Sequence, residues 1–176
     1  MKKFKTKELV FLALLVSLNI VLTRIASIRI PIGGIEGIRI GFGGFPIILA
    51  GILYGPIAGG LVGAVGDILG YFINPIGPYM PHFTLTAALT GIIPAIILIP
   101  NKKPIPSFVE LLIAIGIGQI ITSIILVPYF IQLLFKVSLT ITLPPRIISQ
   151  LIQIPLYASF TELILKKLNL EIQYKA

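Results

Sequence analysis

The sequence predicts an all-α integral membrane protein, a bundle of six transmembrane helices with both termini in the cytoplasm. Hydrophobic residues make up 56% of its 176 residues and charged residues 11%, whereas a soluble domain averages about 45–50% apolar and 25% charged residues. A helix needs about 20 mainly apolar residues to cross a bilayer, so this length holds about six spans. We expect residues 1–176 to form one domain, with no separate soluble module.

The charge balance and the N-terminus fit the same class. Basic residues outnumber acidic ones by fourteen to six, but in a chain this apolar they indicate orientation in the lipid bilayer rather than nucleic-acid binding. The N-terminus resembles a signal peptide, yet its apolar run exceeds the usual length of about 7–15 residues and lacks a small-x-small cleavage site. We expect it to stay as the first helix. The absence of cysteine excludes disulfides, thiolate metal sites and a cysteine nucleophile.

The first three helices are separated by charged residues, glycine and proline. The first, residues 7–26, follows a lysine-rich start. The second, residues 42–54, ends at the pair Gly55-Pro56, which is barely a turn. The third runs over residues 57–73 and stops before Asn74 and its proline.

The last three helices lie between proline-rich or charged segments. They are expected over residues 85–99, 107–135 and 145–168. The second and fourth helices are short for a full span. Short or interrupted helices in transporters often flank a site near the membrane midplane.

Orientation follows from the basic residues. With six spans both termini share one side, where nine basic residues fall: Lys2, Lys3, Lys5, Lys7, Lys102, Lys103, Lys166, Lys167 and Lys175. Five fall on the other side: Arg24, Arg29, Arg39, Lys136 and Arg146. The positive-inside rule therefore places both termini in the cytoplasm. The outer connections, residues 27–41, 74–84 and 136–144, suggest a binding site beneath them, although outer loops can simply be longer.

Asp67 is the residue whose position in the third helix is hardest to explain by packing. It lies about ten residues, or about 15 Å, from the cytoplasmic end of that helix. An ionisable group at that depth costs several kcal/mol unless it is paired or hydrated. Two interpretations stay open: an ion pair with an arginine of a neighbouring helix, or a ligand anchor that accepts two N–H bonds from an amino-pyrimidine or amino-pterin edge. The glycines beside it, Gly59, Gly63 and Gly70 among them, indicate a central helix.

Polar and aromatic residues near the outer loops complete the candidate site. Arginines at its edge suit an anionic ligand, though each could instead extend towards lipid headgroups. The segment NPIGPYMPHFT offers flat rings and the only histidine, His82, for which capping or loop structure is the favoured role. Arg146, Gln150 and Gln153 share one face of the last helix. The candidate substrate-binding residues are Arg24, Arg29, Arg39, Asp67, Asn74, Tyr79, His82, Phe83, Arg146 and Gln150.

These segments together resemble the substrate-binding S components of energy-coupling factor (ECF) vitamin transporters, most closely the folate-specific family. The resemblance covers nearly the whole chain and is carried by RIGFGGFPIILAGILYGPIAGGLVGAVGDILG, NPIGPYMPHFTLTAALTG and LPPRIISQLIQIP. Riboflavin-type members have acidic residues before the proline of the second helix. Here Phe42, Gly43, Gly44 and Phe45 precede Pro46, a departure that counts against riboflavin.

The resemblance implies a binding subunit and no enzyme, with no catalytic residue, metal or cofactor. Such a chain would capture folate or a related vitamin at a prokaryotic plasma membrane. It would then join a transmembrane scaffold subunit and two cytoplasmic ATPase subunits, and topple to release the vitamin inward. The scaffold would contact Ala13 and Ser17, where serine replaces the family's second alanine; internal packing of this small-residue face is an equal alternative.

Other functions remain as alternatives. The chain could bind another small heterocyclic vitamin or precursor, or act alone as a proton-coupled carrier through Asp67. A membrane-embedded enzyme is disfavoured, since the sequence has one histidine, no cysteine and no carboxylate near Asp67. A purely structural bundle would leave Asp67, the outer arginines and the proline-rich loop unexplained.

Overall fold

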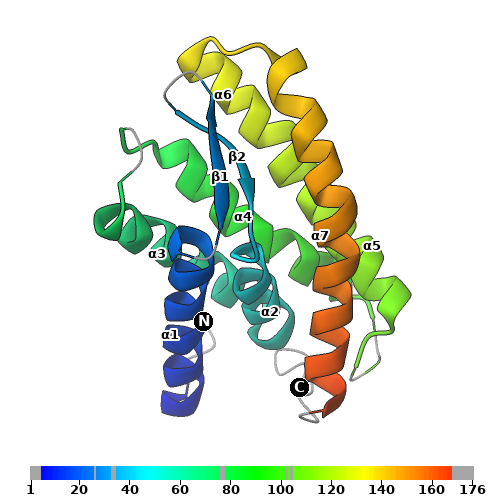
Figure 1. Cartoon of the computed structure of the whole chain (residues 1–176). Coiled ribbons are helices and arrows are strands. Elements are labelled where there is room, and N and C mark those ends of the chain that lie inside the picture. The colour runs from blue at the N-terminus through cyan, green and yellow to red at the C-terminus, as the bar shows by residue number, and fades with distance from the viewer. Residues whose placement is uncertain are drawn as a thin grey trace.

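The structure, a computed structural model, describes residues 5–25, 27–32, 35–75, 78–101, 103 and 105–167. For residues 28–32 and 35–40 it describes the backbone alone. The chain folds into a bundle of helices with a short β-hairpin at one end (Figure 1). Within the described residues, five helical segments are long and apolar enough to cross a membrane.

Two of the five spans contain a π-helical segment. The first span is α1 (Thr6–Ile20) continued by η1 (Val21–Ile25), and the fourth has a π-helical segment, η2 (Ile120–Leu126), near its middle. A π-helical turn holds one extra residue and so changes the face on which the following side chains lie. The second, third and fifth spans are α3 (Pro56–Ile73), α4 (Pro81–Leu98) and α7 (Leu139–Lys167). The fourth span consists of α5 (Phe108–Gln119), η2 (Ile120–Leu126) and α6 (Val127–Phe135) in succession.

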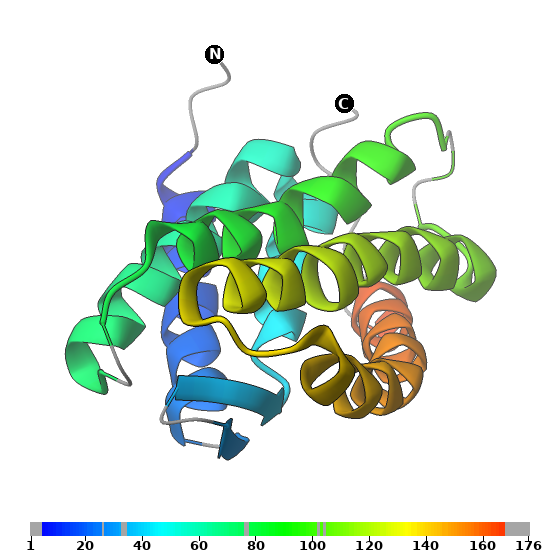
Figure 2. The same ribbon diagram turned by 90° about the horizontal axis from the view of Figure 1, so that it is seen from above.

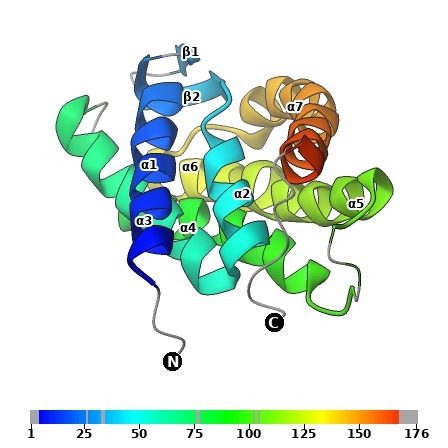
Figure 3. The same ribbon diagram turned by 90° about the horizontal axis from the view of Figure 1, so that it is seen from below.

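One further helix, α2, is too short to span a bilayer. It covers Gly44–Tyr54, 11 residues, or about 16 Å at 1.5 Å per residue, against a hydrocarbon core of about 30 Å. Every residue from 45 to 53 is buried, and Figure 3 shows the helix in the middle of the bundle. In the part of the chain that the structure describes, five of the six expected helices are long enough to span the membrane, and the second is short and buried among them, as its length suggested.

The chain is predominantly helical, as expected, and departs from this only in the first outer connection among the described residues. Residues 27–41 contain an antiparallel hairpin of β1 (Ile28–Ile32) and β2 (Ile35–Ile40). Each strand contains three isoleucines, which favour the extended backbone because β-branched side chains pack well on a pleated surface. The hairpin lies between the end of α1 and α7 (Figures 1 and 2), and β2 packs against α7.

Two helices begin earlier than the sequence predicted. α4 starts at Pro81 rather than residue 85, because proline is favoured in a first helical turn, where its missing N–H would have no partner anyway. α7 starts at Leu139 rather than at Pro145 and includes Pro144 and Pro145, which membrane helices tolerate when neighbouring groups satisfy the freed backbone. The outer connections expected at 74–84 and 136–144 are thus shortened to 74–80 and 136–138.

The glycine-rich helix packs closely against its neighbours, as predicted, but the central helix is α2. α3 packs mainly against α1, α2 and α4, and Leu61 and Leu69 on its outer face are 48% and 46% exposed. A Cβ added to Gly91 of α4 would lie 2.7 Å from the Gly59 backbone of α3, and one added to Gly59 would lie 2.8 Å from the Gly91 carbonyl oxygen. Only glycine allows the two backbones to come this close.

The outer surface of the spans is apolar, as lipid contact requires. Leu14 of α1 and Leu151 of α7, for example, are 62% and 71% exposed. The first turn of α1 and the last turn of α7 lie at the end opposite the hairpin (Figure 1). The hairpin and the α6–α7 connection share the other end, where the cavity described next is found.

Candidate functional site

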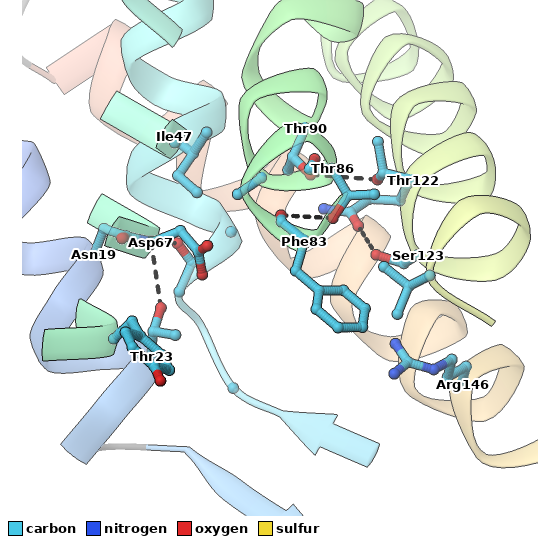
Figure 4. A pocket seen from close by; sticks show the side chains of 18 of the residues that line it. Asn19, Thr23, Ile47, Asp67, Phe83, Thr86, Thr90, Thr122, Ser123 and Arg146 are labelled. Atoms are coloured by element: carbon cyan, nitrogen blue, oxygen red, sulfur yellow. Dashed lines mark hydrogen bonds between the residues drawn. The ribbon is translucent and has the colours of Figure 1, made fainter. Parts of the chain in front are cut away.

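A cavity of about 230 Å³ lies inside the bundle. Its walls come from η1, the start of α2, α3, α4, η2, α6 and α7 (Figure 4). Both π-helical segments contribute to it: Thr23 and Arg24 from η1, and Thr122 and Ser123 from η2. π-helical turns occur preferentially at functional sites, where they redirect side chains.

Asp67 of α3 forms an ion pair with Arg24 on one wall. Arg24 Nη2 lies 3.5 Å from Asp67 Oδ1, and the two side chains are 5% and 18% exposed. Thr84 Oγ1 donates to the other carboxylate oxygen at 2.7 Å, and Arg24 Nη1 donates to the Asn74 carbonyl at 3.3 Å. Of the two interpretations of Asp67, the ion pair is therefore present. The carboxylate also lines the cavity, so it retains lone pairs within reach of a ligand.

Glycines of α3 make room for the polar side chains of the first span. A Cβ on Gly70 would lie 2.9 Å from Arg24 Nε, and one on Gly66 would overlap Asn19 Oδ1. Asn19 in turn donates to the Gly43 carbonyl at 2.7 Å, which fixes the start of α2. These glycines therefore do more than bring backbones together, because they accommodate an arginine and an asparagine inside the bundle.

The opposite wall is a polar stripe on α7. Arg146, Gln150 and Gln153 share one helix face, as predicted, and Tyr157 extends that face; all four line the cavity. Figure 4 shows the Arg146 guanidinium directed from α7 towards the cavity, across from Asp67. Tyr157 Oη donates to the Gly41 carbonyl at 2.8 Å, which ties α7 to the segment after the hairpin.

Aromatic rings and threonines form the remaining wall. Tyr71 and Tyr79 have ring centroids 5.3 Å apart, and the Tyr79 hydroxyl lies 2.9 Å from Thr84 Oγ1. The Phe83 ring projects from the start of α4 into the cavity (Figure 4). Deeper in the bundle, Thr90 Oγ1 donates to Thr122 Oγ1 at 3.3 Å. The cavity therefore combines flat apolar faces, hydroxyls and amides, with charge at two places.

The structure brings six of the ten candidate residues together around the cavity: Arg24, Asp67, Tyr79, Phe83, Arg146 and Gln150. Asn74 is exposed and supplies its backbone carbonyl to Arg24. His82 is not among the lining residues. It lies in the first turn of α4 against Phe130, with ring centroids 4.9 Å apart, and that helix has no side-chain cap. The side chains of Arg29 and Arg39 lie outside the described part of the structure.

Sequence reasoning missed several polar residues of the cavity. They share one signal that was available, a polar side chain inside an apolar helix, which needs a partner at membrane depth. Gln119, 3% exposed, is the clearest of them, with Ser123 Oγ donating to its Oε1 at 2.8 Å. The others are Asn19, Thr23, Tyr71, Thr86, Thr90, Thr122, Ser123 and Tyr157.

Membrane-spanning helices around an internal polar cavity define a protein that holds a small ligand within the bilayer, as the binding parts of transporters do. The sequence pattern of the family described as ECF-type riboflavin transporter, S component, matches residues 3–163. The chain thus belongs to the S components of ECF-type transporters. That family is a substrate-binding component and not an enzyme, and the chain is a multi-pass protein of the membrane.

Individual relatives point to one branch of that family. The folate transporter FolT of Clostridium novyi (strain NT) is 34% identical over 154 residues, covering 88% of this chain and 85% of the relative. FolT of Leuconostoc mesenteroides is 25% identical, covering 93% and 86%. A crystal structure of FolT bound with folic acid matches with TM-score 0.78 and 27% identity over 93% of this chain and 95% of that one. The structure of the S component of a bacterial ECF transporter matches with TM-score 0.68 and 26% identity, at the same coverage.

Proposed function

We propose that this chain captures folate from outside the cell for ATP-driven uptake. The observation that carries the proposal is the make-up of the cavity, in which Arg146, buried amides and the rings of Tyr79 and Phe83 surround one space. Folate is a flat pterin joined to a glutamate tail, so it needs aromatic faces, amide-type hydrogen bonds and a cation. The similarity to FolT proteins and to FolT bound with folic acid supports the same ligand.

The unbiased test is mass spectrometry of the molecule that co-purifies with the chain when no ligand is added. We expect a folate or reduced folate at close to one molecule per chain. A flavin at that ratio would contradict the proposal and favour the second candidate, riboflavin, which the description of the family pattern names. A different heterocycle without a pterin would also overturn the folate assignment.

The orientation follows from charge. The last turn of α7, which carries Lys166 and Lys167, and the start of α5, where Glu110 pairs with Lys103, lie at the end opposite the hairpin (Figure 1). The positive-inside rule therefore favours a cytoplasmic position for that end and an external cavity mouth. Because the chain has no cysteine, a single introduced cysteine shows on which side of the membrane its position lies. We expect a membrane-impermeant maleimide to label Ser138→Cys in intact cells and Lys103→Cys only after permeabilisation. The reverse pattern would refute the orientation.

The proposed partners are a transmembrane scaffold subunit and two cytoplasmic ATPases. Ala13 and Ser17 are exposed on one face of α1, and the Ser17 hydroxyl donates to the Ala13 carbonyl at 3.0 Å, which leaves a flat surface of small side chains. Such a surface permits close approach of another helix. Co-purification with these subunits tests the assembly, whereas folate uptake that persists without any ATPase would favour a stand-alone carrier.

A further inference from the structure

Gln150 and Gln153 leave two buried polar atoms without a partner. The residues are 6% and 7% exposed, and Gln150 Nε2 donates to Gln153 Oε1 at 3.4 Å. Within the described part of the chain, Gln150 Oε1 and Gln153 Nε2 make no hydrogen bond. Buried polar groups are nearly always satisfied, so such a pair calls for a partner from elsewhere.

These two atoms differ from other buried atoms without a hydrogen-bond partner because their residues line the cavity. His82 Nδ1 and Thr161 Oγ1 also lack a partner among the described residues, but neither residue lines the cavity. Both glutamines do line it. A molecule in the cavity can therefore supply partners to the two glutamines, and it cannot do so for His82 or Thr161.

The pair offers one donor and one acceptor whichever way its amides are turned. If both amides exchange oxygen and nitrogen, Gln153 donates to Gln150, and a free donor and a free acceptor remain. The Tyr157 hydroxyl donates its one hydrogen to the Gly41 carbonyl, so towards Gln153, 3.3 Å away, it can act as an acceptor, which favours the arrangement in which Gln153 turns its nitrogen to Tyr157. The complementary ligand edge has an acceptor beside a donor, as in an oxo group next to a ring N–H or a ring nitrogen next to an amino group.

The surroundings favour a neutral ring at this point. Gln153 lies seven residues beyond Arg146 along α7, about 10 Å deeper from the hairpin end. The neighbouring cavity side chains Tyr157, Gln119 and Thr122 are uncharged and 1–3% exposed. An anionic tail is better placed nearer the mouth beside Arg146.

We propose that the coupled amides of Gln150 and Gln153 form the subsite that binds the hydrogen-bonding edge of the ligand's planar heterocycle. The inference rests on the proposed function and deepens it, because it assigns the pterin edge to α7 rather than to Asp67. Asp67 then holds Arg24 and the start of α4 in place, and the glutamine pair forms the hydrogen bonds to the heterocycle.

The test compares Gln150→Met and Gln153→Met, which keep side-chain length and remove both polar atoms. Isothermal titration of each detergent-purified variant is run with folic acid and with p-aminobenzoylglutamate, which lacks the pterin. We expect each variant to bind folic acid about 10- to 100-fold more weakly, the effect of losing a buried hydrogen bond. Binding of p-aminobenzoylglutamate should change less than about threefold, because its groups do not reach this subsite.

Gln132→Met is the matched control, since Gln132 is exposed on α6 and does not line the cavity; it should bind folic acid as the wild type does. Folic acid affinity within about threefold of wild type in both cavity variants would overturn the inference. Equal losses for both ligands would do so too, by showing a general loss of the cavity. If the wild type itself fails to bind folic acid, the proposed function fails first, and the two failures are thereby distinguished.

Discussion

Arg24→Met is expected to destabilise the protein strongly, and Asp67→Asn in the same chain should recover most of the loss. Arg24 is 5% exposed at its side chain and is the cation paired with Asp67. Its removal leaves a carboxylate at membrane depth with one hydroxyl partner, Thr84. Breaking a buried pair from one side costs about 3–5 kcal/mol, whereas removing both charges is often close to neutral. We expect about 3 kcal/mol for the single variant, because Asp67 keeps 18% exposure.

The measurement is the thermal midpoint of the helical signal in far-ultraviolet circular dichroism, in detergent and without ligand. The control is Lys166→Met, which removes an ion pair with Glu162 that is shorter, 2.8 Å, but has its lysine 63% exposed. Exposed pairs contribute about 0–1 kcal/mol, so this variant should melt close to wild type. If the double variant Arg24→Met, Asp67→Asn melts as low as Arg24→Met alone, the unpaired carboxylate is not the cause of the lost stability.

Arg146→Gln is expected to weaken folic acid binding about 100-fold. Arg146 is half-buried, lines the cavity and is directed into it (Figure 4). A guanidinium–carboxylate contact in such a place contributes about 2–3 kcal/mol, which corresponds to roughly 30- to 150-fold in affinity. Arg146→Lys should recover part of the loss, because lysine keeps the charge and loses the forked geometry.

A chemical double-mutant cycle identifies which part of the ligand Arg146 contacts. Wild type and Arg146→Gln are each titrated with folic acid and with folic acid whose glutamate carboxylates are converted to amides. If Arg146 binds the tail, amidation costs much less affinity in the variant than in the wild type. Equal cost in both proteins would place Arg146 away from the glutamate.

The sequence could predict the membrane class, the close packing of the glycine-rich helix and the polar face of α7, because each depends on a local sequence pattern. It could also identify Asp67 as a residue that needs explanation. It could not choose the partner of Asp67 among four outer arginines. That choice depends on the π-helical turn η1 and on the space left by Gly70, and neither has a clear sequence signal.

Two features that were not predicted, the hairpin and two buried amides of the cavity, do have sequence signals. The segment IRIPIGGIEGIRI has alternating isoleucines before a Gly-Gly pair and again at its end, a pattern typical of hairpins. Gln119 and Asn19 stand out as amides in apolar helices. The early start of α7 had no such signal, because Pro144 and Pro145 normally mark a helix start, whereas here they lie inside the helix.

The central claim, that this chain is a folate-binding S component, is tested most directly by titrating the purified wild type with folic acid and, in parallel, with riboflavin. The cavity, with its cation, aromatic walls and buried amide pair, predicts saturable one-to-one binding of folic acid with a dissociation constant below about 1 μM. It predicts no saturable binding of riboflavin, which has no glutamate tail for Arg146. Saturation by riboflavin, or no saturable binding of folic acid below about 1 μM, would contradict the account.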